Sequence, residues 1–323
     1  MKILVAPLNW GLGHASRCVP IVQRLLDEGH EVVLGGDGDS FTLLRRHFPR
    51  LRYVYLAPLR MEYSAGKSQV WAMVKALPRL LVWSRKDHIM LKAVLREETF
   101  DQVISDNRFG LYNKQVECVY ITHQLHIRLP KGWRWMEQFV SRVHACVYTR
   151  FNKVWVPDYE EEDKCLGGEL SHTHRPVSGR FASSIEYIGP LSRFSNHQSS
   201  NRSSFEVVAV LSGLEPHRTL LEKEIRARYQ DRREQVLIIQ GLMNRPNTRL
   251  RRGNITLVPY MNDTEMAGAF QNAEHIIVRS GYSTIMDLEA LGVLHKAELI
   301  PTPGQPEQEY LAAFIAEKLQ KNA

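Results

Sequence analysis

Short apolar runs alternate with segments of helical periodicity, and this alternation constrains the fold more than any other feature of the chain. Residues 2–8 form the first run, a glycine-rich turn follows, and residues 15–30 space their apolar side chains as a helix does until Gly29 ends it. Residues 31–36 form the next run, so residues 2–36 make a β-α-β unit. Because such units join parallel strands, the pattern predicts a doubly wound α/β sheet.

The pattern stops at residues 195–204, a polar stretch without apolar periodicity that indicates an exposed linker or loop. Further apolar runs, with helical segments between them, follow this stretch. The runs are 206–213, 235–241, 254–260, 275–281 and 297–302. Because 323 residues exceed the size at which one hydrophobic core stops growing, we expect two Rossmann-like domains, 1–184 and 185–323, with parallel sheets facing across a cleft.

The charge balance of the chain indicates an anionic partner. The formal net charge is +7 and the isoelectric point is near 9.2, which suits a nucleotide diphosphate, an acidic lipid surface or nucleic acid. Nucleic acid is the least favoured, because no basic run is continuous or paired with a known module. The four cysteines lie far apart without a CxxC pair, which argues against disulfides and a zinc site. No apolar run reaches the roughly 20 residues of a membrane span, so we expect a cytoplasmic protein.

A first candidate site lies in the loop of residues 9–17, between the first strand and the first helix. Gly11 and Gly13 allow a close backbone approach, and the free N–H groups of the helix N-terminus can face an anion or a polar substrate. His14 is then displayed at the carboxyl edge of the sheet. Asp106 follows a buried strand parallel to the first, so it can orient the imidazole and stabilise its protonated form. A histidine and an aspartate that merely cap their segments are the alternative.

A second candidate site combines residues 279–292 with residues 300–313. Ser280 and Gly281 end a strand there, and Ser283 or Thr284 can cap the helix that follows. An ordinary strand–turn–helix connection would show the same pattern.

The two segments together resemble the donor-binding region of GT-B glycosyltransferases, especially the peptidoglycan N-acetylglucosaminyltransferase that forms lipid II. In that family an acid on this helix binds the ribose hydroxyls, and Asp287 takes its place, one methylene shorter than the usual Glu. A pair of polar residues in the next loop binds the donor sugar, and Gln308 and Glu309 match them, although the second is acidic here. The resemblance also makes Arg193 a candidate diphosphate ligand.

Further segments match the family in order and spacing. Ser212, Gly213 and Arg218 replace its glycine-rich phosphate turn, and Met261 lies in the segment that contacts the base. The family usually continues past the last helix, so the resemblance implies either a looser closure between domains or a shortened chain. The residues expected to bind the donor are Gly11, Gly13, Arg193, Ser212, Gly213, Arg218, Met261, Ser280, Gly281, Ser283, Thr284, Asp287, Gln308 and Glu309.

Residues 70–86 and 128–151 mix Trp, Phe and Leu with Lys and Arg. Such helices can lie at a bilayer interface, where a lipid-linked acceptor would be met. Half-buried helices of a soluble domain are the alternative, and Pro78 is expected to interrupt the first stretch. The first interpretation implies contact with the inner face of the membrane.

The sequence thus predicts an inverting glycosyltransferase that uses a nucleotide-sugar, UDP-linked by resemblance, and a hydroxyl acceptor, lipid-linked or a cell-envelope glycan precursor. His14 would be the base and Asp106 its partner, and neither a metal nor a cofactor is expected, because helix N-termini and Arg193 can carry the leaving-group charge. Two alternatives stay open. The residues GLGHASRC also resemble the nucleotide-sugar hydrolase of pseudaminic acid biosynthesis, and a non-catalytic sugar-nucleotide binding module would share the fold.

Overall fold

The computed structural model describes residues 1–58, 69–172, 185–195, 204–213, 215–243 and 245–322, and for 69–77 and 322 the backbone only. The chain forms two compact units, of which the first runs through Leu191 and the second begins at Ser192. No helix among the described residues combines the length and the apolar character needed to cross a bilayer.

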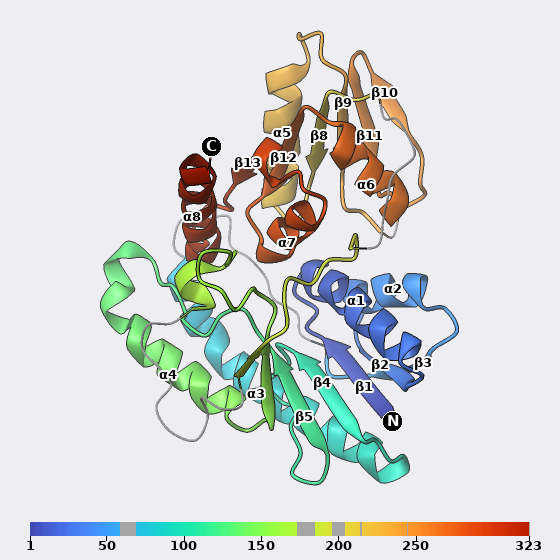
Figure 1. Cartoon of the computed structure of the whole chain (residues 1–323), viewed down its shortest axis with the longest axis vertical. Helices are drawn as coiled ribbons and strands as arrows, with labels where there is room; N and C mark the ends of the chain where they lie inside the picture. The colour runs from blue at the N-terminus through green and yellow to red at the C-terminus, as the bar shows by residue number, and fades with distance from the viewer. Residues whose placement is uncertain (59–68, 173–184, 196–203, 214, 244, 323) are drawn as a thin grey trace. The chain divides into compact units, whose positions relative to one another are not determined.

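The first unit is built on a seven-stranded sheet in the order β3-β2-β1-β4-β5-β6-β7, with every neighbouring pair parallel (Figure 1). Its strands are β1 (Lys2–Pro7), β2 (Glu31–Gly36), β3 (Arg52–Tyr55), β4 (Gln102–Asp106), β5 (Glu117–Ile121), β6 (Lys153–Val156) and β7 (Ile185–Tyr187). The order reverses between β1 and β4, as in a Rossmann fold.

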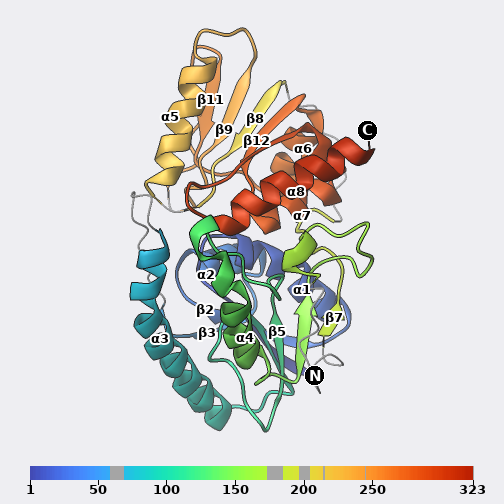
Figure 2. The same cartoon turned by 90° about the vertical axis from the view of Figure 1, so that its left-hand side faces the viewer.

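Helices cover both faces of this sheet. They are α1 (Gly13–Asp27), α2 (Gly38–His47), α3 (Gln69–Glu97), α4 (Glu137–Tyr148), and the 3-10 turns η1 (Lys131–Met136) and η2 (Gly168–Leu170). Helices α1 and α2 lie on one side, and α3 and α4 on the other (Figure 2). Leu91 of α3 and Tyr148 of α4 pack in one cluster with Leu4, Val103 and Tyr120 of the strands. With helices on both faces, β1 and β4 are buried almost throughout.

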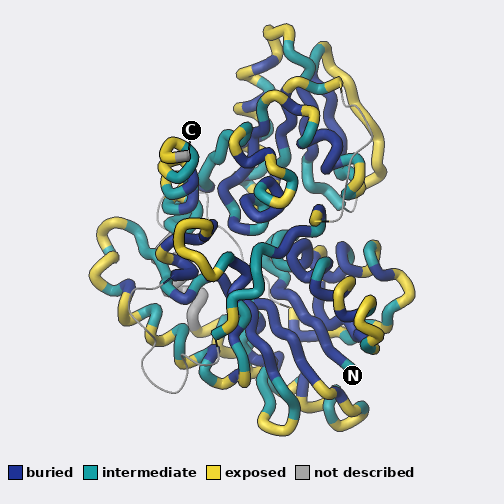
Figure 3. Tube along the Cα trace, viewed as in Figure 1, coloured by how far each residue is buried: buried dark blue, intermediate teal, exposed yellow. Residues whose placement is uncertain are grey.

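The second unit is built on a six-stranded sheet in the order β10-β11-β9-β8-β12-β13, parallel except for the edge pair β10–β11. Its elements are β8 (Val207–Val210), α5 (His217–Tyr229), β9 (Val236–Ile239), β10 (Leu250–Arg252), β11 (Ile255–Val258), α6 (Asp263–Asn272), β12 (His275–Arg279), α7 (Tyr282–Ala290), η4 (Leu294–Lys296), β13 (Ala297–Ile300) and α8 (Pro306–Asn322). The inner strands of each unit form its buried centre (Figure 3).

The α/β fold with two Rossmann-like halves is confirmed, and several details differ from the expectation. The division expected at 184/185 falls before β7, the last strand of the first sheet, whereas the two compact units divide after Leu191. Only three residues of β7 pair with β6, too few to show a periodicity in the sequence. The expected linker at 195–204 lies mostly outside the described residues.

Helix α3 continues through Pro78 instead of being interrupted by it. A proline inside a helix removes one backbone hydrogen bond and crowds the preceding turn, a cost of about 3 kcal/mol or more that packing can offset. Trp83 and Leu91 of the same helix are buried against the rest of the first unit, and their burial stabilises the continuous helix.

Candidate functional site

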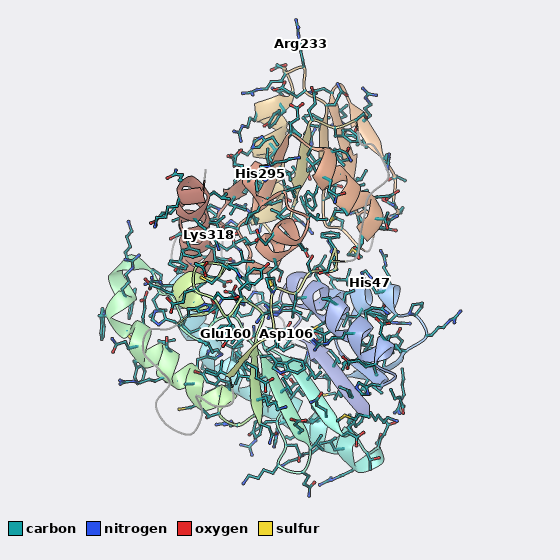
Figure 4. The ribbon with its side chains drawn as sticks, in the orientation of Figure 1. His47, Asp106, Glu160, Arg233, His295 and Lys318 are labelled. Carbon is teal, nitrogen blue, oxygen red and sulfur yellow. The ribbon has the colours of Figure 1, made fainter. Side chains whose placement is uncertain are left out.

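The first unit brings His14 and Asp106 together where the strand order of its sheet reverses. Strands β1 and β4 are neighbours in register, with Pro7 opposite Asp106, so their carboxyl ends form one edge. Asp106 is the last residue of β4, and Figure 4 labels it at this end of the strands. His14 lies in the first turn of α1, which follows β1. Ligands of doubly wound sheets bind at this reversal point.

The two side chains form a hydrogen-bonded pair. Nδ1 of His14 lies 3.0 Å from Oδ1 of Asp106, whose carboxylate is fully buried, whereas 17% of the His14 side chain is exposed. Among the described residues, Nε2 of His14 has no hydrogen-bond partner in the chain. A carboxylate that holds one ring nitrogen while the other is left to accept a proton is the arrangement of a general base.

Arg17 is a third member of this site, and the sequence analysis missed it. Its Nε donates to Oδ2 of Asp106 at 2.7 Å, and its Nη2 donates to Oδ1. Nη2 also lies 2.9 Å from Nδ1 of His14, and Nη1 lies 3.3 Å from Nδ1 of the buried His123. The signal available in the sequence was spacing, since Arg17 is three residues after His14 and so on the same helix face.

These contacts set the charges of the site. Burial alone would raise the pKa of Asp106, but Arg17 and His14 together hold it far below its ordinary value, so the group is a carboxylate at neutral pH. Burial lowers the pKa of His14; Asp106 opposes this effect, and Arg17 and His123 add to it. The site therefore favours a neutral imidazole beside a fixed ion pair.

Side chains from outside the loop hold the glycine-rich turn before His14. Asn9 donates to Asp37 at 3.1 Å, and the hydroxyl of Ser40 donates to the carbonyl of Gly11 at 3.1 Å. Gly11 has a φ of +79°, a conformation that favours glycine. Asp37 is buried and pairs at 3.0 Å with the buried Arg108, because that guanidinium needs a carboxylate partner in the interior.

The second unit places most of its expected donor residues at the carboxyl ends of its strands. The order reverses between β8 and β12, which are neighbours. Ser212 and Gly213 follow β8, and Ser280 and Gly281 follow β12, so both turns flank the reversal point. Gly281 is the N-cap of α7.

The expected capping of helix α7 by Ser283 or Thr284 is not found. The helix begins at Tyr282, so both residues lie in its first turn, and no side-chain bond caps its N-cap residue, Gly281. Glycine is tolerated at this position, and the extended backbone of Gly281 allows the helix to begin earlier than the first hydroxyl residue.

Asp287 of helix α7 and Arg193 lie close together. The hydroxyl of Ser192 donates to Oδ1 of Asp287 at 2.6 Å, and Nε of Arg193 lies 3.9 Å from Oδ2. Nη1 of Arg193 also lies 3.2 Å from Oδ1 of Asp263. Burial raises the pKa of Asp287 to about 6, although Arg193 and Ser192 act in the opposite direction. The charge of Arg193 is thus shared between two carboxylates, and a diphosphate would have to compete with them.

The remaining donor candidates contact their own loops and neighbouring turns, since the carbonyl of Gln308 accepts from the hydroxyl of Ser280 at 2.8 Å and Arg218 donates to the carbonyl of Gly241 at 3.4 Å. Arg218 pairs with Glu215, with Nη2 at 2.6 Å from Oε1. Gln308 accepts a hydrogen bond from the amide of Thr302 at 2.8 Å, and Glu309 accepts one from Gly304 at 3.3 Å. Met261 follows β11 and precedes α6. All four lie in segments that follow the carboxyl ends of strands. Among the described residues, no hydrogen bond or ion pair joins one of these four to another.

Arg279 of β12 is a further buried cation of this edge that the sequence analysis did not assign to the site. Its Nη1 donates to the carbonyl of Pro301 at 3.0 Å, and its Nη2 donates to the carbonyl of His217 at 2.9 Å. It therefore ties the loop after β13 to the first turn of α5, two segments that flank the proposed donor turns.

One group in the described part of the chain has the composition of a metal site, namely Asp158, Cys165 and His172. The carboxylate of Asp158 already accepts from Tyr159 and Leu166 at 2.8 Å each and from Gly167 at 2.9 Å, as well as from Ser171. Because its lone pairs are used by these hydrogen bonds within the turn, the carboxylate of Asp158 is a poor ligand for a cation. The group thus fits a structural role better than a metal site.

Comparisons with known proteins agree with this architecture. The chain is 23% identical to an uncharacterized glycosyltransferase of Methanosarcina acetivorans over 340 residues, which cover 98% of the chain and 84% of that protein. The solved structure of the spinosyn forosaminyltransferase SpnP is similar at a TM-score of 0.56 and 13% identity, covering 99% of the chain and 95% of that protein. The spinosyn rhamnosyltransferase SpnG complexed with thymidine diphosphate is similar at 0.53 and 14%, covering 99% and 92%.

No protein-family model matches the chain. The similarities to solved structures have low sequence identity and therefore concern the fold. The curated relative is similar in sequence over nearly the whole chain. Two Rossmann-like units of parallel strands, with polar residues at each reversal point, agree with both comparisons. The chain is therefore an enzyme of the glycosyltransferase class with the GT-B fold.

Proposed function

We propose that the protein transfers a sugar from a UDP-linked donor to a hydroxyl acceptor, with inversion at the anomeric carbon and without a metal ion. The pairing of His14 with Asp106 at the reversal point of the first sheet carries this proposal. The pair leaves Nε2 of His14 able to accept a proton, which a hydroxyl nucleophile must lose as it attacks.

The reaction is a single displacement. The acceptor oxygen attacks the anomeric carbon, its proton passes to Nε2 of His14, and the bond from that carbon to the diphosphate oxygen breaks. The bonding electrons leave with the nucleoside diphosphate, so the carbon is inverted. Asp106 stabilises the imidazolium that forms, because its carboxylate lies 3.0 Å from Nδ1.

The donor would bind at the reversal point of the second sheet. Support comes from the turns of Ser212–Gly213 and Ser280–Gly281, which precede helices α5 and α7, whose first N–H groups suit an anion. Asp287 would accept hydrogen bonds from the ribose. The SpnG structure holds thymidine diphosphate, which supports a pyrimidine nucleoside diphosphate as the leaving group.

The acceptor is proposed to be lipid-linked, a precursor of a cell-envelope glycan, and to be met at the membrane surface. Support comes from a row of exposed apolar side chains along η1 and α4, spaced four residues apart. Trp135 is 78% exposed, Phe139 62% and Val143 49%. We call these three residues the α4 ridge. The exposed Lys131, Arg134 and Arg142 flank it, and cations beside aromatic side chains suit an anionic bilayer surface.

Helix α3 also carries exposed apolar side chains in the part whose side chains are described. Leu81, Val82 and Ile89 are exposed there. Residues 70–77, the other part of the expected membrane-facing stretch, lie outside the described side chains.

The proposal is tested by turnover with a panel of UDP-linked and dTDP-linked sugars, each with and without polyprenyl-linked and small hydroxyl acceptors. Transfer requires that sugar appear on the acceptor and that nucleoside diphosphate release depend on the acceptor. Release of free sugar at the same rate without acceptor would instead establish a hydrolase. Binding that stabilises the protein without any turnover would establish a binding module.

A further inference from the structure

We propose that Arg17 is a positioning residue that holds Asp106 in place and selects the tautomer of His14 in which Nε2 can accept a proton. The role in turnover rests on the proposed function, whereas the effect on the histidine itself can be measured without any substrate. The evidence is the set of contacts among three side chains, two of them buried.

Three atoms compete for hydrogen bonds at this point. Nη2 of Arg17, Oδ1 of Asp106 and Nδ1 of His14 each lie within hydrogen-bond distance of the other two. A guanidinium can only donate and a carboxylate can only accept, whereas Nδ1 donates in one neutral tautomer and accepts in the other. In one neutral tautomer Nδ1 donates to Asp106 and Nε2 carries no proton. In the other, Nδ1 accepts from Arg17 and the proton is on Nε2.

The geometry of Arg17 favours the first of these states. Its Nε and Nη2 both donate to the carboxylate, the forked arrangement that suits a guanidinium and a carboxylate. The two N–H bonds of Nη2 diverge in the guanidinium plane, so the one directed to Oδ1 leaves the other poorly aimed at Nδ1. The charge-assisted bond to Asp106 is the stronger, and Nδ1 keeps its proton to donate to the same carboxylate.

His123 helps to hold the guanidinium. It follows strand β5 and is buried, and its Nδ1 can accept from Nη1 of Arg17 at 3.3 Å. The charged or titratable groups that face His14 are thus Asp106 from β4, Arg17 from α1 itself and His123 from the turn after β5. Two of the three disfavour the imidazolium.

The arrangement has a consequence for the pH dependence of the base. The cation of Arg17 lies beside Nδ1 and partly neutralises Asp106, so together with burial it keeps the pKa of His14 below its ordinary value. His14 is then in its neutral, proton-accepting form at neutral pH. Asp106 still faces the ring, so the imidazolium formed during transfer has a carboxylate partner.

The test is a titration of His14 by NMR in the parent protein and in Arg17→Gln, with ring nitrogen shifts to identify the tautomer. In the parent we expect the Nδ1–H tautomer and a pKa below about 6.5. In Arg17→Gln we expect a rise of about one pH unit or more, the size of effect that a neighbouring charge produces. The acid limb of the kcat/KM profile should move to higher pH by the same amount.

Two further variants separate positioning from a structural role. Arg24→Gln removes an exposed arginine of the same helix and should leave both the titration and the acid limb unchanged. Arg17→Lys keeps the charge but loses the fork, so it should restore most of the pKa while the tautomers mix. A loss of melting temperature without a shift of the acid limb would show that Arg17 is merely structural.

The inference can fail separately from the proposed function. A parent His14 with the Nε2–H tautomer, or with a pKa at or above about 6.5, would overturn it even if Arg17→Gln does not fold. A titration that follows the expectation in a protein whose His14→Ala variant is fully active would keep the inference about the ring and remove the proposed base.

Discussion

Arg17 and His14 meet at the same oxygen of Asp106, one turn apart on helix α1. The catalytic pair proposed for this protein is therefore part of a buried cluster in which a permanent cation and a titratable ring share one carboxylate. Such a cluster is rigid, because Asp106 is fully buried and each of its oxygens accepts from Arg17. Asp106 is therefore needed both for the stability of the fold and for the orientation of His14.

Replacing His14 by Ala should lower kcat by roughly 10²–10⁴-fold, the usual contribution of a positioned base. Donor affinity should stay nearly unchanged, since the proposed donor site, with the turns Ser212–Gly213 and Ser280–Gly281 and with Asp287, lies in the second unit. The measurement is kcat, nucleotide-sugar affinity and melting temperature on one sample. A folded variant that transfers sugar at the parental rate would refute the mechanism while leaving the fold intact.

Replacing Asp106 by Asn should destabilise the protein strongly, by about 3–5 kcal/mol, because it leaves the buried Arg17 without its counter-ion. From the sequence alone the same substitution would be expected to lower turnover as His14→Ala does, but by a smaller factor. Denaturant unfolding measures the difference, and Asp101→Asn, at an exposed position before the same strand, is the control. Restoration of stability in the double variant Asp106→Asn/Arg17→Met would confirm that the unpaired charge is the cause. Wild-type stability in the single variant would contradict this explanation.

The sequence predicted the backbone of both sites because the relevant rules are local. Strand ends, glycine turns and helix starts follow from periodicity and from the glycines, and the carboxyl ends of neighbouring parallel strands must share an edge. His14 and Asp106 could therefore be brought together from positions 92 residues apart in the chain. Each is tied to a strand end whose place in the sheet is set by topology.

The side-chain network around these positions could not be predicted in the same way. Arg17 looked like an ordinary helical arginine, and only the depth at which α1 packs shows that it is 2% exposed and bound to Asp106. The sequence GDGD around Asp37 is typical of a solvated turn, but Asp37 pairs with Arg108 from a loop 71 residues away. Which charged side chains become buried partners depends on the packing of several elements at once, and no short pattern encodes it.

Asp287 should make donor binding depend on pH. Burial raises its pKa to about 6, so it is largely protonated below that pH, and only the ionised form can accept from both ribose hydroxyls. Affinity for a UDP-sugar should thus rise with pH and be about tenfold weaker at pH 5 than at pH 7.5. A UDP-sugar is the right probe because, unlike UDP, it has no terminal phosphate that titrates in this range.

Calorimetric titration across this pH range measures the effect, and Asp287→Asn should bind weakly at every pH with a flat profile. Glu289→Gln, on the same helix, is the control and should keep the parental profile. A parental protein with constant affinity between pH 5 and pH 7.5, or an Asp287→Ala variant that binds as tightly as the parent, would remove Asp287 from the ribose site.

Transfer should continue in the presence of EDTA. The proposed leaving-group stabilisation comes from the helix N-termini and from cations of the second unit, and Asp158 uses its carboxylate oxygens to hold its own turn. Initial rates before and after chelation provide the measurement. Loss of turnover that is restored by Mg²⁺ or Mn²⁺ would show that a metal carries the charge of the diphosphate.

The α4 ridge should bind vesicles that contain anionic lipid. Transferring one large apolar side chain out of water contributes about 1.5–3 kcal/mol when it is fully buried, so removing Trp135 and Phe139 together should weaken partitioning by at least about tenfold. Flotation with phosphatidylcholine vesicles, with and without phosphatidylglycerol, measures the binding of the parent and of Trp135→Ser/Phe139→Ser. Binding should also fall as salt rises, because Arg134 and Arg142 face solvent and their attraction to the surface is screened.

Leu220 and Leu250 provide a matched control for this experiment, since both are about as exposed as Val143 but lie in the second unit, away from the ridge in the sequence. Leu220→Ser/Leu250→Ser should bind vesicles as the parent does if the ridge is the contact, because the loss of apolar area alone then has no effect. Equal loss in both double variants would indicate non-specific adsorption of exposed leucine and aromatic side chains. Full binding by Trp135→Ser/Phe139→Ser would remove the ridge from the membrane contact, and with it the structural support for a lipid-linked acceptor.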